Sequence, residues 1–124
     1  MRKLLTVALF ASLFISTGSC RLDEPGYPFQ IIVEGANGNR VQNAFVNCFV
    51  PLPNTNIRYA GYTSVAGTKY FRHEGGEVVL QVQVTKGEDP ISAAGCGYIK
   101  LEPNQLVQQT IVVEDYDPLD PGCE

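Results

Sequence analysis

Apolar and polar residues alternate along most of the chain between residues 29 and 113. The clearest case is the segment 77–85, in which every second residue from position 78 is apolar, namely Val78, Leu80, Val82 and Val84. A period of two is typical of a β-strand with one buried face. The pattern therefore predicts a strand over residues 77–85 whose valines and leucine point into a core.

Six further segments are short and rich in β-forming residues: residues 29–34, 44–50, 57–65, 68–72, 97–102 and 106–113. Glycine, proline and asparagine separate them, as at Gly75-Gly76 and Pro103-Asn104. No helix of ten residues fits between these breaks. Seven short strands joined by turns predict an all-β domain, built as a sandwich or a small barrel.

The first twenty residues follow a different pattern. Arg2 and Lys3 precede an apolar run over residues 4–15, and small residues then lead to Cys20. This layout is typical of a secretory signal peptide. Because the run is too short to span about 30 Å of hydrocarbon as a helix, we expect it to be cleaved.

The position of Cys20 refines this expectation. The sequence Thr17-Gly18-Ser19-Cys20 resembles the lipobox of bacterial lipoproteins, although Thr17 stands where the strict form has leucine. In that family the cysteine becomes the mature N-terminus, carries a diacylglycerol and is usually N-acylated, for example with palmitate. The resemblance implies a signal peptide over residues 1–19, lipidation at Cys20 and an anchor in the outer membrane, on its periplasmic or surface-exposed face. The alternative is an ordinary signal peptide that leaves Cys20 a plain thiol.

Removal of residues 1–19 changes the charge. The remaining 105 residues hold seven bases against 13 acids, so the net charge moves from −4 to −6. An acidic chain argues against a nucleic-acid partner, because phosphate binding needs a basic face. Prolines mark residues 20–28 as a lipidated tether, five acids mark residues 114–124 as a solvated tail, and residues 29–113 remain as the domain.

The order of motifs in the first half of the domain resembles a known family. A strand ends in a glycine turn over residues 33–38, and then follow Ala44 before Val46, Gly61 before Thr63, and an aromatic pair after Gly67. This order resembles the carboxypeptidase regulatory-like domain, and it implies a single seven-stranded immunoglobulin-like or transthyretin-like sandwich. The aspartate that usually precedes the later glycine is absent. The family is mostly structural or binding, so no catalytic residue carries over.

Three cysteines remain after Cys20. Because Cys48, Cys96 and Cys123 are an odd number, at most one internal disulfide forms. A disulfide between Cys48 and Cys96 would covalently link two sheets, as in immunoglobulin domains. A bond between Cys96 and Cys123 at the edge of the domain is an alternative, and reduced cysteines are a third.

The chain offers little for catalysis or metal binding. His73 is its single histidine, and no nucleophile, phosphate-loop or zinc motif occurs. Asp115, Asp117 and Asp120 lack the glycine and distal glutamate of a calcium loop. We therefore expect no catalytic residue, no metal site and no cofactor.

Tyrosines are the remaining candidates for a binding site. Tyr59, Tyr62 and Tyr70 lie on neighbouring predicted strands, and stacked tyrosines on a sheet suit sugars or peptides. The alternative is that some of them belong to the core.

The sequence thus favours a membrane-anchored envelope lipoprotein with a non-catalytic structural or protein-interaction module. A glycan- or peptide-binding lipoprotein and a pilus or fibre subunit are the alternatives.

Overall fold

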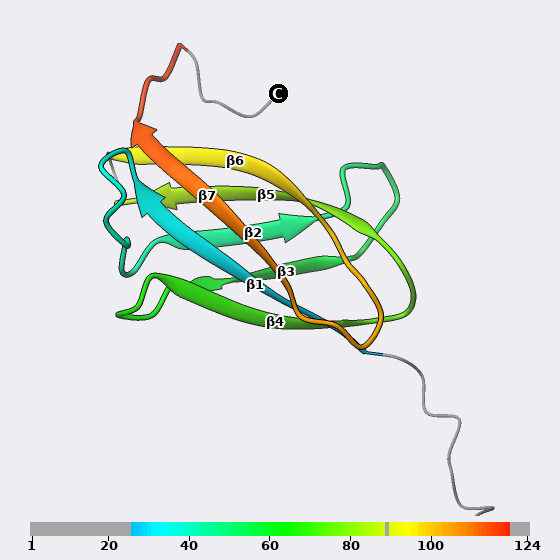
Figure 1. Cartoon of the computed structure of the whole chain (residues 1–124). Helices are drawn as coiled ribbons and strands as arrows, with labels where there is room; N and C mark the ends of the chain where they lie inside the picture. Colours follow the sequence, from blue (N-terminus) through cyan, green and yellow to red (C-terminus); the bar gives the residue numbers. More distant parts are fainter. Residues whose placement is uncertain (1–25, 89, 120–124) are drawn as a thin grey trace, which may run out of the picture.

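The computed structural model describes residues 26–88 and 90–119, and it folds them into seven strands (Figure 1). The strands are β1 (Gly26–Gly35), β2 (Phe45–Phe49), β3 (Arg58–Tyr62), β4 (Thr68–Glu74), β5 (Val79–Lys86), β6 (Ala93–Lys100) and β7 (Val107–Asp115). The predicted all-β domain of seven strands is confirmed. Within these two ranges, no helix is long and apolar enough to span a membrane.

Several strands extend beyond their predicted limits. β1 begins at Gly26 and not at Phe29, so residues 26–28 of the predicted tether belong to the sheet. β6 begins four residues early, at Ala93, and β7 continues to Asp115, into the predicted tail. The cause is backbone pairing with distant strands, since Gly26 lies opposite Glu74 and Ala93 lies opposite Asp115.

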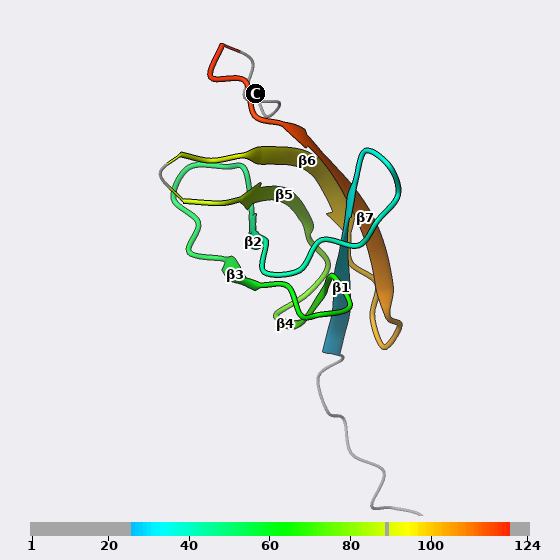
Figure 2. The same ribbon diagram turned by 90° about the vertical axis from the view of Figure 1, so that its left-hand side faces the viewer.

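The strands follow one another in a single order, β3-β2-β5-β6-β7-β1-β4. β1 and β7 are parallel and all other neighbours are antiparallel. β6 and β7 pair over only two residues, Ala93 with Asp115 and Ala94 with Glu114. This short link leaves the sheet continuous but divides it into β4-β1-β7 and β3-β2-β5-β6. In Figure 2, β1 and β7 lie on one side while β2, β3, β5 and β6 are stacked on the other. The result is one nearly closed, barrel-like sheet.

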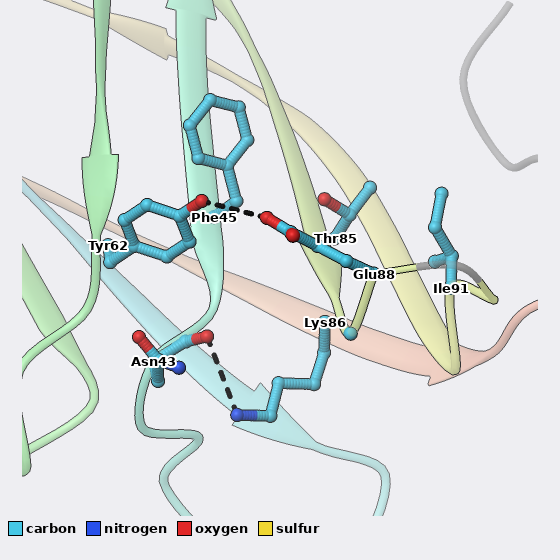
Figure 3. A pocket seen from close by; sticks show the side chains of 8 residues that line it. Asn43, Phe45, Tyr62, Thr85, Lys86, Glu88 and Ile91 are labelled. Carbon is cyan, nitrogen blue, oxygen red and sulfur yellow. Dashed lines mark hydrogen bonds between the residues drawn. The ribbon is translucent and has the colours of Figure 1, made fainter.

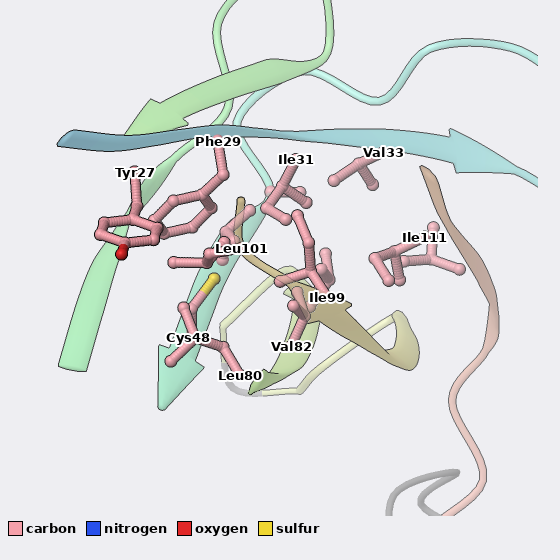
Figure 4. Packing of buried hydrophobic residues seen from close by; sticks show 14 residues of the cluster. Tyr27, Phe29, Ile31, Val33, Cys48, Leu80, Val82, Ile99, Leu101 and Ile111 are labelled. Carbon is pink, nitrogen blue, oxygen red and sulfur yellow. The ribbon is translucent and has the colours of Figure 1, made fainter. Parts of the chain in front are cut away.

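The core lies between these two groups of strands (Figure 4). The inward positions predicted for β5 are confirmed at Leu80, Val82 and Val84, which are fully buried, while Gln81 between them is also buried. β1 contributes Phe29, Ile31 and Val33 from the opposite side. The other buried apolar residues are Tyr27, Ala44, Val46, Cys48, Ile99, Leu101, Ile111 and Val113.

Small residues on the inner side of β6 allow β7 to cross closely over it. A Cβ atom on Gly97 would lie 2.6 Å from Cδ1 of Ile111, and one on Gly95 would meet the carbonyl oxygen of Val112. Ile111 is buried and occupies the space that side chains at these two positions would need. The glycines therefore bring the two groups of strands together at the point where β7 leaves β6.

Side chains close the gap between the two end strands, β3 and β4. A hydrogen bond of 2.7 Å joins Tyr59 Oη and His73 Nδ1, and His73 is only 3% exposed. Further along, the aliphatic part of Lys69 lies against Gly61, and its ammonium sits 5.7 Å from the centre of the Phe71 ring. Between β3 and β4, packed side chains thus take the place of backbone hydrogen bonds. We call this line of side-chain contacts the seam.

Substitution of Gly95 by alanine is expected to destabilise the domain. The new methyl group would meet the backbone of Val112, which cannot move without shifting β7, so we expect a loss of about 2 kcal/mol in the free energy of unfolding. Urea denaturation followed by circular dichroism measures it. Gly97→Ala is the matched control and should cost less, because the flexible tip of Ile111 can rotate away. Equal costs would contradict a backbone contact at Gly95.

Candidate functional site

The three tyrosines of the predicted binding face do not share a face. Tyr59 packs on the inner side, edge-on to Phe29 at 5.6 Å between ring centres, and bonds to His73 in the seam. Tyr62 lies three residues further along β3 and therefore points outward. Tyr70 is 53% exposed on β4, opposite Gln30 of β1. The expectation of one tyrosine face is wrong, because Tyr59 points inward and Tyr62 outward; Tyr62 lines a depression.

That depression lies on the outer face of β2, β3 and β5, where β5 runs into the loop before β6 (Figure 3). Its volume is about 730 Å³. The lining residues are Asn43, Phe45, Tyr62, Thr85, Lys86, Gly87, Glu88 and Ile91. They come from three strands and two loops, so the depression exists only in the folded sheet. We call it the Tyr62 pocket.

An aromatic pair forms one wall of the Tyr62 pocket. Phe45 and Tyr62 are directly opposite each other in the ladder between β2 and β3. Their ring centres are 5.2 Å apart and their planes are tilted by 57°. Tyr62 keeps 49% of its surface exposed, so a ligand can reach its ring. Cross-strand aromatic pairs of this kind stabilise the sheet and hold both rings in place.

Charged groups at the pocket are also held in place. The Tyr62 hydroxyl donates a hydrogen bond of 3.1 Å to Oε1 of Glu88. Lys86 Nζ donates to the carbonyl oxygens of Gln42 and Asn43, at 2.6 and 3.4 Å. The hydrogen bond to Glu88 and the charge of that carboxylate both raise the pKa of Tyr62, because the carboxylate disfavours a neighbouring phenolate. The described lining of the pocket thus combines a phenol, a carboxylate and an ammonium group.

These groups suit the binding of a small molecule. The pocket combines two aromatic rings with a carboxylate, an amide and a hydroxyl, which stack against a ligand and exchange hydrogen bonds with it. Among the described residues, no three His, Cys, Asp or Glu side chains gather in a way that could hold a metal ion. The arrangement thus favours recognition of a ligand by packing and hydrogen bonding.

Most residues of the Tyr62 pocket are not evident from the sequence. Glu88 lies 26 positions from Tyr62, in a loop, and only the fold brings them together. The partnership of Phe45 with Tyr62 depends on the register between β2 and β3. The sequence does show that Tyr59 and Tyr62 cannot share a face. They are an odd number of residues apart, which places them on opposite faces of a strand.

The expected disulfide between Cys48 and Cys96 is not formed. Cys48 is a buried free thiol, whereas Cys96 is disulfide-bonded. Cys48 lies opposite Val82 on the inner face, and Cys96 lies opposite Gln83 on the outer face. With β5 between their strands, the two are separated by about twice the 4.8 Å strand spacing, which is too far for a disulfide. Cys123, the alternative partner, and Cys20, the predicted lipid site, lie outside the described residues.

No family model matches the chain, and no curated protein sequence matches it.

Cys48 is expected to resist alkylation in the native protein. Burial raises the pKa of its thiol to about 12, and the thiolate is the reactive form. Iodoacetamide at pH 8 should therefore modify Cys48 more slowly in the folded than in the urea-unfolded protein, by on the order of a thousandfold. Trypsin cleaves after Arg40 and Arg58, so mass spectrometry sees Cys48 as the one cysteine of its peptide. Similar rates in both states would show that the thiol is accessible.

Removal of the Glu88 charge is expected to lower the pKa of Tyr62. Glu88→Gln keeps a hydrogen-bond acceptor near the hydroxyl but removes the negative charge, so the phenolate forms at lower pH. Two-dimensional NMR of the Tyr62 ring across an alkaline titration measures the change. Glu77→Gln removes an exposed carboxylate that lies before β5, at the other end of the strand, and should leave the Tyr62 titration unchanged. An unaltered curve in Glu88→Gln would disprove the contact.

Proposed function

We propose that the chain is a lipid-anchored protein of the cell envelope whose β domain is a non-catalytic structural or protein-interaction module. The observation that carries the proposal is Cys20 after the small residues Thr17, Gly18 and Ser19, at the end of a signal-peptide pattern. The anchor would be acyl chains at Cys20, and several chains together hold a protein firmly at a membrane. The domain would supply contacts through its surface and loops.

The start of β1 supports a domain held close to the membrane. Only residues 21–25 separate Cys20 from Gly26, and five residues span at most about 18 Å. The Gly26 end of the sheet also holds Asn104, whose N–H donates a 2.7 Å hydrogen bond to the Gly26 carbonyl. This end would face the membrane. The opposite end, with Gly35 and the loop between β5 and β6, would face away from it.

We also propose that the domain is a transthyretin-like or immunoglobulin-like sandwich, related to the carboxypeptidase regulatory-like family. The division into β4-β1-β7 and β3-β2-β5-β6, with the core between them, supports this proposal. The two-residue link between β6 and β7 would then be the edge at which two layers meet.

The structure bears on the two alternative functions, a pilus or fibre subunit and a glycan- or peptide-binding protein. A pilus or fibre subunit would need an open strand edge for a neighbour. Tyr59 and Lys69 fill the seam between β3 and β4, whereas β6 and β7 pair with each other over only two residues. Peptide or glycan binding on a shared face of three tyrosines is incompatible with their positions. A ligand-binding role is instead favoured by the Tyr62 pocket.

Substitution of Cys20 by serine is expected to release the protein from the membrane. Serine has no sulfur to accept a diacylglycerol, so the variant should move to the soluble periplasmic or culture fraction. Fractionation and incorporation of labelled palmitate into the wild-type chain measure this. Ser19→Gly keeps a small residue before the cysteine and should stay membrane-bound. Continued membrane retention of Cys20→Ser would refute the lipid anchor.

A further inference from the structure

We propose that the Tyr62 pocket binds a neutral saccharide, an inference that relies on the proposed envelope location only for access to glycans. The pocket has about 730 Å³, within the range of about 300 to 1,000 Å³ that is usual for small-molecule sites. Anchoring of the chain at a membrane does not by itself require such a pocket.

The aromatic wall fits the apolar face of a sugar ring. A pyranose presents C–H groups on one side and hydroxyl groups around its edge, so it packs on aromatic rings. Tyr62 is half exposed, and its contact with Phe45 and its bond to Glu88 limit the rotation of the ring. A ring that is already fixed loses little conformational entropy when a ligand binds.

The polar lining fits sugar hydroxyl groups. Each hydroxyl is both a donor and an acceptor, and it pairs with carboxylate, amide and hydroxyl groups. Glu88 has a second carboxylate oxygen besides the one that accepts from Tyr62. The side chains of Asn43 and Thr85 line the same pocket and can donate and accept (Figure 3).

The charges of the lining favour an uncharged ligand. Among the described lining residues, Glu88 and Lys86 carry one negative and one positive charge, so these residues together have no net charge. The Lys86 ammonium is directed at two backbone carbonyls, and this leaves it poorly placed to neutralise an anion. The excess of acids over bases in the chain adds to the repulsion of an anionic sugar.

The backbone around the pocket argues against an added peptide strand. Phe45 lies opposite Tyr62 on one side and opposite Thr85 on the other, so β2 is paired along both edges here. A peptide that adds to a sheet needs an unpaired edge. Recognition at this site must therefore use side chains, which suits a saccharide better than an extended peptide.

The test is a binding measurement on the full chain in detergent micelles. The probes are N,N′-diacetylchitobiose, maltotetraose and cellotetraose, with tetragalacturonate as the anionic comparison. Saturation-transfer difference NMR should detect binding of at least one neutral probe, with a dissociation constant of about 1 mM or tighter. No transfer from any neutral probe at about 10 mM would overturn the proposal, as would tighter binding of tetragalacturonate.

Substitutions of two exposed tyrosines test whether the saccharide binds at the Tyr62 pocket. Tyr62→Ala should weaken binding about tenfold or more, because it removes the stacking surface. Tyr70→Ala, which removes an equally exposed tyrosine from β4, should leave the affinity unchanged. Thermal unfolding of both variants checks that the fold is retained. Equal loss in both variants, or unchanged binding in Tyr62→Ala, would overturn the proposal. Cys20→Ser should bind as the wild type does, so failure of the anchor and failure of the pocket are separable.

Discussion

The close crossing of β7 over β6 is the contact on which the rest of the fold depends. It requires inner positions of β6 without side chains, which Gly95 and Gly97 provide, and a residue that fills the space, which is Ile111. Once β7 has diverged there, it pairs in parallel with β1 and places Phe29 opposite the valines of β5. The positions of β4, of the seam and of the enclosed core all follow from that placement.

The same strand register fixes both the interior and the candidate site. On β2, Val46 and Cys48 are fully buried, so the intervening positions face outward. Phe45 is therefore held beside Tyr62 by the pairing that buries its neighbours. A shift of β2 by one residue would expose its buried side chains, so the packing of the core keeps the aromatic wall of the pocket in place.

Local patterns predicted the strands, while the arrangement in space depended on contacts far apart in sequence. Short β-rich runs between turn residues located all seven strands, because each run and its flanking turns are visible in the local sequence. Pairing extended β1 to Gly26, which its proline-rich sequence did not indicate. The order β2-β5-β6 separates Cys48 from Cys96, and it cannot be inferred from the spacing of two cysteines. Glu88 reaches Tyr62 from a loop, where no periodic pattern exists.

The pairing of β1 along both of its edges has a mechanical consequence. β1 is the first strand of the domain, and it lies between β4 and β7. A pull on the chain before Gly26, resisted at the far end of the sheet, acts along the axis of β1. Both ladders are then loaded in shear, and many hydrogen bonds must break together rather than one after another. The strand next to the chain's N-terminal segment is thus the one best placed to transmit tension without peeling from the sheet.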